Sequence, residues 1–275
     1  MRVAFFVCLT LLGCSGSAPN SAIRELSVVS INLRHDQDFW EERFDLVADE
    51  IVRLDPDLIG LQEIEISVDQ SQVLHERIVE RGGADYAIFE QLKFGVQGLG
   101  GEGVGVFSRF PILETDAVDL DHGRPGVFVR LSLGDGERIE FFNTHLHNVG
   151  EDEVRRAQMQ SMVAFADQHA DGAPQILTGD MNALPDSGTL NAALDVGWRD
   201  SFTDANPSAL GATSGIRLRK DDPTPQRAQN RIDYVLYAPR GRLSVVSSTV
   251  TFDRPRADGL YPSDHLGVLS VFELR

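Results

Sequence analysis

Short apolar runs recur along most of the chain. Each run is long enough for one β-strand and too short to cross a membrane. Between them, residues 39–54, 68–79 and 154–169 have the spacing of amphipathic helices. The strand-like runs are 26–31, 58–61, 86–89, 104–108, 127–133, 139–144, 175–178, 232–237, 245–252 and 268–272. Strands alternate with helices early, whereas closely spaced runs in the middle indicate hairpins. The pattern predicts an α/β fold with a pair of mixed sheets and outer helices.

The length and charge of the chain limit what it can be. No Pro-, Gly- or Ser-rich linker divides the 275 residues, so we expect one domain over residues 22–275. The 42 acidic residues outnumber the 25 basic ones, which gives a formal net charge of −17. Such a chain repels a phosphate backbone at long range, which argues against a broad non-specific nucleic-acid binder.

The N-terminus resembles a bacterial lipoprotein signal. Arg2 precedes the apolar run 3–12, and Leu11-Leu12-Gly13-Cys14 places a cysteine where such signals are cleaved and lipidated. We expect residues 1–21 to be a signal and short tether, with Cys14 anchoring an exported protein to a bacterial envelope membrane. An ordinary secretory signal is the alternative. Cys8 is the only other cysteine, so the folded body has none for a disulfide or a cysteine-based zinc site.

Polar residues gather where the apolar runs end. They are Asn32, Glu63, His145, Asp180, Asn182, Asp233, Asp264 and His265. Each alone has a structural explanation, since Asn and Asp after a strand commonly form a turn. However, strand ends that lead into loops are also where α/β folds place active sites.

Seven segments together resemble the endonuclease/exonuclease/phosphatase superfamily, the DNase I-like fold. In chain order they are Ser-Ile-Asn at 30–32, DLIGLQE at 57–63, GVFSRFPI at 105–112, NTHL at 143–146, TGDMN at 178–182, RIDYV at 231–235 and Ser-Asp-His at 263–265. Any one is weak, but the ordered set is specific and covers residues 30–265. The resemblance implies a four-layered α/β/β/α sandwich with its site at one edge, between the two sheets.

The resemblance also implies a metal and a base. Hydrolysis of a phosphodiester requires a cation near the phosphoryl oxygens and an oriented water, and oxygen ligands suit Mg²⁺ or Mn²⁺. Glu63 would be the principal ligand, helped by Asn32 and Asp264. Asp180 would accept a proton from the attacking water, while Asn182 would hold the water or the phosphate.

The remaining implied roles concern the phosphoryl group. His265 would donate to a phosphoryl oxygen, with Asp233 fixing its tautomer and charge. His145 would bind the phosphate or assist the leaving group, and Arg124 matches a phosphate-contacting arginine. We expect His147 to lie beyond a turn of the chain, outside the site.

Other polar and aromatic residues are expected to be structural. Arg109 is expected to tie a loop to a carboxylate, His35 and His122 to face solvent, and Trp40 and Trp198 to lie in the core. The Gly98–Gly103 segment matches a dinucleotide-binding pattern, but a strand-like run follows it where that motif requires a helix. We therefore expect a surface loop there.

The longest irregular segment, 204–230, contains a basic cluster of Arg217, Arg219, Lys220 and Arg227. One interpretation is a solvated loop, partly neutralised by its own aspartates at 221 and 222. The other is that the loop flanks the site and binds a second phosphate or an anionic headgroup.

Three functions remain open. The first is a metal-dependent phosphoesterase acting on a small or lipid-derived phosphodiester outside the cytoplasm. The second is an exported DNase I-like endonuclease, the one case in which nucleic acid would be a partner. The third is a catalytically silent binding module, which would have no need for Asp180, Asp233 and His265 together. A monomer is expected in each case.

Overall fold

The computed structural model describes residues 24–95, 101–238 and 242–274. The predicted signal, its tether and Cys14 lie outside these residues, as do residues 98–100 of the Gly98–Gly103 segment. A strand, not a helix, follows that segment, which agrees with the expectation. In the ranges just given, no helix has both the length and the apolar character needed to cross a bilayer.

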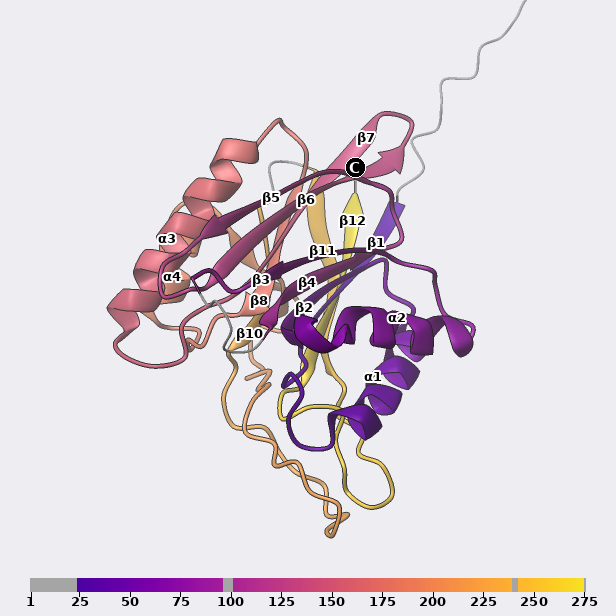
Figure 1. Ribbon diagram of the computed structural model, residues 1–275. Helices are drawn as coiled ribbons and strands as arrows, with labels where there is room; N and C mark the ends of the chain where they lie inside the picture. Colours follow the sequence, from indigo (N-terminus) through magenta and orange to yellow (C-terminus); the bar gives the residue numbers. More distant parts are fainter. Residues whose placement is uncertain (1–23, 96–100, 239–241, 275) are drawn as a thin grey trace, which may run out of the picture.

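Two six-stranded sheets pack face to face (Figure 1). In spatial order, the first contains β11 (Leu243–Thr251), β12 (Gly267–Leu274), β1 (Arg24–Asn32), β2 (Leu58–Glu65), β4 (Glu102–Ser108) and β3 (Ala87–Leu92). The second contains β5 (Ile112–Asp119), β6 (Pro125–Gly134), β7 (Glu137–His145), β8 (Gln175–Asp180), β10 (Asp233–Ala238) and β9 (Arg199–Asp200). Each sheet is mixed, because β1–β2 and β7–β8 are parallel pairs among antiparallel ones.

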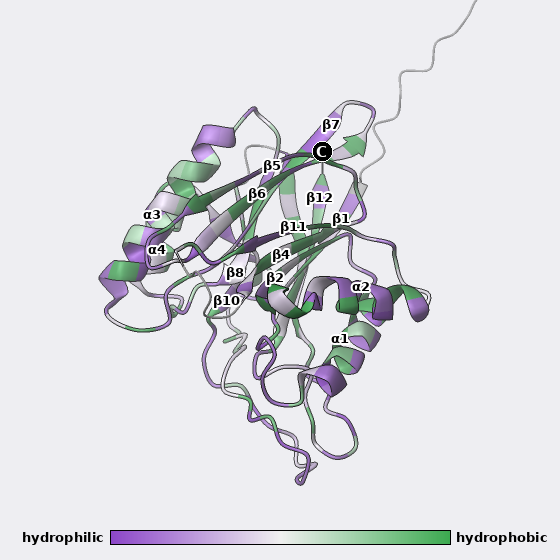
Figure 2. Cartoon of the chain, viewed as in Figure 1, coloured by the Kyte–Doolittle hydropathy of each residue, from purple (hydrophilic) through white to green (hydrophobic). Residues whose placement is uncertain are grey.

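Helices cover the outer face of each sheet. The helical elements are α1 (Trp40–Leu54), η1 (Ile66–Val68), α2 (Gln70–Glu80), α3 (Asp152–His169), α4 (Gly188–Leu194) and α5 (Ser201–Ala205). The apolar face of α1, including Phe44 and Ile51, packs with α2 on the first sheet. Met159 and Met162 of α3 pack with α4 on the second. The four-layered α/β/β/α sandwich is therefore confirmed (Figures 1 and 2).

The layer between the sheets changes from apolar to polar along its length. Aliphatic side chains such as Val28, Val129 and Ile176 fill most of it. A buried polar group takes over near the predicted site. Gln62 Nε2 donates to Asn143 Oδ1 (2.7 Å), and Asn143 Nδ2 donates across the interface to the carbonyls of residues 61 and 105 (2.8 and 2.9 Å). These bonds fix one sheet against the other because buried polar groups are costly to leave unpaired.

The predicted elements differ from the structure mainly where an element is short or its sequence is polar. The second helix begins at Gln70 rather than residue 68, after the 3₁₀ turn. β5, α4, β9 and α5 were not predicted. The middle of β5 is exposed and carries Glu, Thr and Asp, so it lacks the apolar alternation that identifies a strand.

Three of the structural expectations can be judged away from the site. Arg109 forms an ion pair with Asp55 and donates to the carbonyl of Pro56, so it does tie a loop to a carboxylate. Trp198 is buried in the core, whereas Trp40 is only half-buried at its margin.

Gly60 allows the sheets to approach each other. A Cβ at this position would come 2.8 Å from Thr178 Cβ and 2.9 Å from Asn143 Oδ1, with Thr178 Oγ1 nearer still. We expect Gly60→Ala to lower the free energy of unfolding by about 1–3 kcal/mol, because the sheets must separate. Urea denaturation measures this. Thr178→Ala should reduce the effect, and an equal loss in both backgrounds would contradict this account.

Candidate active site

Asn32 joins the two sheets at the centre of the predicted site. It ends β1 and is fully buried. Its Nδ2 donates to Glu63 Oε1 in the first sheet (3.1 Å) and to Asp180 Oδ2 in the second (3.1 Å). Glu63 lies at a bulge in β2, with a φ of 52°. Because a bulge redirects a side chain, this irregularity lets Glu63 turn toward Asn32.

Asp180 and Asp233 are the two buried carboxylates of the group. Asp180 ends β8 and is 1% exposed. Its Oδ1 accepts from the backbone N–H of Asn182 (2.9 Å), while Oδ2 lies 3.6 Å from His145 Nε2 and 3.8 Å from His265 Nδ1. Burial, followed by the nearby charge of Asp233, raises the pKa of Asp180 above its usual range.

His265 is held by Asp233. Its Nδ1 lies 2.9 and 3.1 Å from the two carboxylate oxygens of Asp233, at the start of β10. Burial opposes the charged form of this ring, but Asp233 and Asp180 outweigh it and raise the pKa of His265 to about 10. His265 is therefore an imidazolium at neutral pH, and Nε2 is left to donate elsewhere.

His145 is in the opposite protonation state. It ends β7, is 3% exposed, and has a pKa lowered by burial and then by the positive charge of Arg124. Its Nε2 lies 3.1 Å from Asn182 Nδ2, an amide that can only donate. The neutral ring therefore carries its proton on Nδ1. As predicted, the chain leaves the strand after His145, and the His147 ring stacks on that of His122 with centroids 4.7 Å apart.

Glu102 belongs to this region and was missed from the sequence. Its Oε1 lies 3.8 Å from both His145 Nδ1 and Arg124 Nη1. Glu102 could have been found only from the pairing of β2 with β4, in which it lies opposite Glu65, two residues beyond Glu63. Arg124 is buried, and its Nη2 donates to Asn148 Oδ1 (3.1 Å).

Asp264 and His35 lie at the rim. Asp264 Oδ2 is 3.3 Å from Arg34 Nη1, and Ser263 Oγ donates to the carbonyl of Asn32 (2.6 Å). Asp264 is thus at the same end of the sandwich, while its role as a metal ligand stays a prediction. The expectation that His35 faces solvent was wrong, because the ring is half-buried with Nε2 3.9 Å from Glu63. His122 is exposed, as expected.

Arg43 in α1 holds the loops that carry Asn32 and Asp264. Its guanidinium is fully buried and donates to six backbone carbonyls. Five belong to residues 33–38, just after Asn32, and the sixth to Pro262, two residues before Asp264. Burial lowers the pKa of Arg43 to about 10, yet the group remains charged near neutral pH. Sequence reasoning missed this residue.

Among the residues that the structure describes, three groups of side chains have potential metal-binding atoms within 4.8 Å of one another. They are Glu63, Glu102 and His145; Asp180, Asp233 and His265; and His35, Asp36 and Glu65. The first two meet at Asp180 and His145. Carboxylates dominate this arrangement, and hard oxygen donors suit a hard divalent cation.

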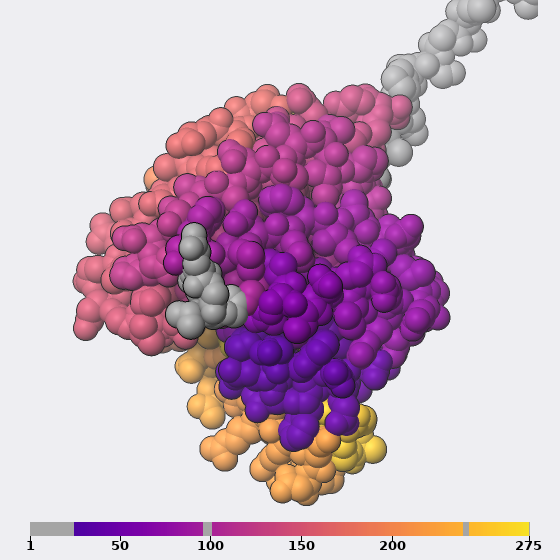
Figure 3. Space-filling model, viewed as in Figure 1, coloured from indigo at the N-terminus to yellow at the C-terminus, as the bar shows by residue number. Residues whose placement is uncertain are grey.

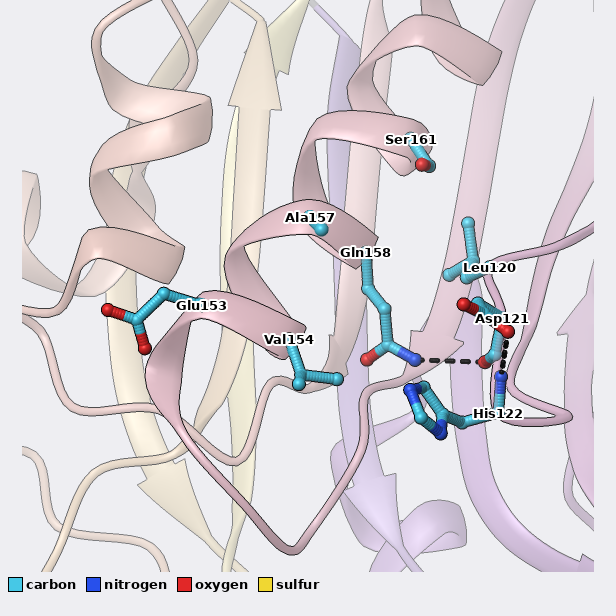
Figure 4. Close-up of a pocket in the computed structure, with 8 residues that line it drawn as sticks. All are labelled: Leu120, Asp121, His122, Glu153, Val154, Ala157, Gln158 and Ser161. Carbon is cyan, nitrogen blue, oxygen red and sulfur yellow. Dashed lines mark hydrogen bonds between the residues drawn. The ribbon is translucent and has the colours of Figure 1, made fainter.

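A separate hollow lies beside this region, between the 120–122 turn and α3 (Figure 4). Gln158 Nε2 crosses it to the carbonyl of Asp121 (3.0 Å), and its Oε1 accepts from the backbone of His147 (2.9 Å). None of the predicted site residues lines this hollow, which therefore lies apart from the catalytic candidates.

The pairing of His265 with Asp233 can be tested in solution. In the metal-free chain, we expect the His265 imidazolium signal to persist between about pH 6 and pH 8, where an unperturbed histidine loses its proton. Asp233→Asn should lower the pKa and bring the titration into this window, as followed by ¹H–¹³C NMR. Asp135→Asn, in the exposed turn between β6 and β7, is the control. A His265 titrating near pH 6.5 in the unsubstituted chain would contradict the pairing.

Comparison with known proteins agrees with this geometry. Residues 29–265 match the Endonuclease/Exonuclease/phosphatase family. The protein angel of Drosophila melanogaster is 28% identical over 173 residues, which are 58% of this chain and 48% of that protein. A putative neutral sphingomyelinase of Caenorhabditis elegans is 26% identical over 303 residues, covering 93% of this chain and 68% of the relative. The chain thus spans about half the length of the first relative and two thirds of the second.

Solved structures show the same fold. A mannosyl-6-phosphatase of Bacteroides thetaiotaomicron superposes with a TM-score of 0.74 at 22% identity, covering 90% of this chain and 99% of that one. The family match covers every site residue described above and all strands of both sheets except β12 and the start of β1. The chain therefore belongs to the endonuclease/exonuclease/phosphatase family, whose members are metal-dependent phosphoesterases and nucleases.

Proposed function

We propose that the chain hydrolyses a small or lipid-derived phosphodiester by in-line attack of water, with Mg²⁺ or Mn²⁺ as the metal. One observation carries the proposal. The buried Asp180 carboxylate lies between the Asn182 amide, the Asn32 amide and the His265 imidazolium. The name of the nematode relative, a putative neutral sphingomyelinase, supports a lipid-derived diester as substrate.

The donor set fits a divalent cation. Glu63, with its side chain 18% exposed, is accessible from solvent, whereas Asp180 and Asp233 are buried. Negative charges held this close in a poorly solvated region repel each other, so a bound cation would stabilise them. Glu63 would be the principal ligand, with Asn32 and Asp264 beside it. When bound, such an ion would polarise a phosphoryl oxygen and withdraw charge from it.

We assign the role of general base to Asp180. Its Oδ1 is held by the Asn182 backbone, which leaves Oδ2 facing the group formed by Asn32, His145 and His265. The raised pKa of Asp180 makes its carboxylate a better proton acceptor than an exposed aspartate. In the proposed step, Oδ2 takes a proton from the water that attacks phosphorus.

His265 supplies positive charge to the phosphoryl oxygens. Because Asp233 occupies Nδ1, the ring is fixed and only Nε2–H can donate to substrate. Negative charge accumulates on the non-bridging oxygens during the reaction, and a preorganised imidazolium stabilises it without reorganisation. His145 is neutral and accepts from Asn182, so in this arrangement it orients Asn182 at the edge of the site.

A metal-dependent activity panel on the full chain tests the proposal. Bis-p-nitrophenyl phosphate, sphingomyelin, a phosphoinositide, p-nitrophenyl phosphate and supercoiled plasmid would be tested with Mg²⁺, Mn²⁺ and EDTA. We expect hydrolysis of a small or lipid diester in Mg²⁺ or Mn²⁺ and none in EDTA. Asp180→Asn should reduce kcat by roughly 10³-fold, since it removes the base, and His265→Ala by roughly 10²-fold.

Matched variants separate chemistry from folding. Asp186→Asn and His122→Ala change the same residue types away from the proposed reacting atoms and should leave kcat unchanged. Plasmid nicking that requires metal and is lost in both active-site variants would favour the endonuclease alternative. Preferential cleavage of p-nitrophenyl phosphate would replace the diester with a monoester. A folded chain without activity toward any substrate would leave the silent binding module.

A further inference from the structure

The segment 213–230 is hydrogen-bonded to the end of the sandwich that carries the candidate active site. Leu266 N–H donates to the carbonyl of Thr213 (2.6 Å), and Ile216 N–H donates to that of Asp264 (3.2 Å). Thr213 Oγ1 accepts from the backbone N–H of Asp233 (3.3 Å). The segment is therefore joined by backbone bonds to the two residues that flank His265 and by the Thr213 hydroxyl to Asp233. It descends beside the C-terminal loop and projects beyond α1 (Figures 1 and 3).

This segment brings Arg217 and Arg227 together. It folds back on itself, with Ser214 paired to Asn230. Farther out, Gln226 uses its side chain to bond both backbone groups of Arg217, at 2.8 Å each. Arg227 follows Gln226 directly. The two arginines therefore lie across from each other on the two facing limbs of the segment, one containing Ser214 and the other containing Asn230. Both arginines are exposed, whereas Ile216 and Ala228 on either side of them pack inward.

The charges of the segment are unequally neutralised. Arg219 forms an ion pair with Asp222 (2.7 Å), and Lys220 with Glu42 (2.7 Å). Within the described ranges, the guanidinium groups of Arg217 and Arg227 have no ion pair or hydrogen bond. Two like charges on facing limbs repel each other, and the segment's own Asp222 is already paired with Arg219. An anion between them would remove the repulsion.

We propose that Arg217 and Arg227 bind a second phosphoryl group of a small phosphodiester substrate. Guanidinium groups bind phosphate oxygens through paired N–H donors. Such a pair of arginines therefore suits a phosphoryl group better than a neutral headgroup. Ile216, which bonds the carbonyl of Asp264 in the predicted metal-binding loop, directly precedes Arg217, and Arg227 lies on the facing limb. This inference rests on the proposed function, because it assigns the pair to the same substrate.

Binding of two product-like probes tests the pair directly. Asp180→Asn is used as background to prevent turnover, in Mg²⁺, with thymidine 5′-monophosphate and thymidine 3′,5′-bisphosphate as ligands for isothermal titration calorimetry. We expect the bisphosphate to bind at least about tenfold more tightly. Adding Arg217→Gln and Arg227→Gln should abolish this preference and leave binding of the monophosphate within about twofold.

Arg219→Gln is the matched control, because it removes a charge from the same segment that Asp222 already neutralises. It should retain the bisphosphate preference. Equal affinities for the two probes, or an equal loss in Arg219→Gln, would overturn the proposal. Thermal unfolding should be unchanged by Arg217→Gln and Arg227→Gln, since these two side chains are exposed.

Two further results separate the possible failures. If a single-stranded 12-mer oligonucleotide binds more tightly than the bisphosphate and depends steeply on Arg217 and Arg227, the pair belongs to a nucleic-acid surface and the small-substrate proposal is wrong. If the bisphosphate preference holds but no diester is hydrolysed, the anion site stands while the proposed activity fails.

Discussion

The crowding of carboxylates where the two sheets meet dominates this structure. Asp180 and Asp233 are buried, and Glu63 lies close to Asp180 through the Asn32 amide. Burial makes each negative charge unfavourable, and proximity makes the set more so. The protein offsets this with one imidazolium, His265, and amide donors, which is less positive charge than the carboxylates carry. A bound cation would offset that imbalance, which supports the metal in the proposed function.

Holding such a set together requires loops that do not themselves add negative charge. Arg43 fixes these loops by donating to backbone carbonyls. Its positive charge is therefore not neutralised by a carboxylate bonded to it. Its charge therefore contributes to the field at the site while its geometry fixes the chain on both sides of it. The buried amide of Asn143 has the corresponding role beneath the site, since it locks the sheets that carry Asn32 and Asp180.

Sequence reasoning recovered the residues that end apolar runs, because in such residues strand periodicity and chemistry coincide. Asn32 and Asp180 are examples. It failed where position depends on partners distant in sequence. Glu102 is recognisable only once β4 is paired with β2, and Arg43 occupies an ordinary place on an amphipathic helix until the loops fold around it. β5 was missed for a different reason, because an exposed edge strand needs no apolar face.

The distribution of charge restricts the substrate more than the net charge does. A net charge of −17 repels any polyanion at long range, so attraction must arise from groups at the site itself. Arg34 and Arg124 are near it, but Asp264 and Glu102 lie within 4 Å of them and offset their charges. A long nucleic acid would meet the repulsion along its whole length and gain little from these few groups. A compact diester meets less of it and can be held by short-range contacts, which is the physical reason for favouring a small substrate on this acidic protein.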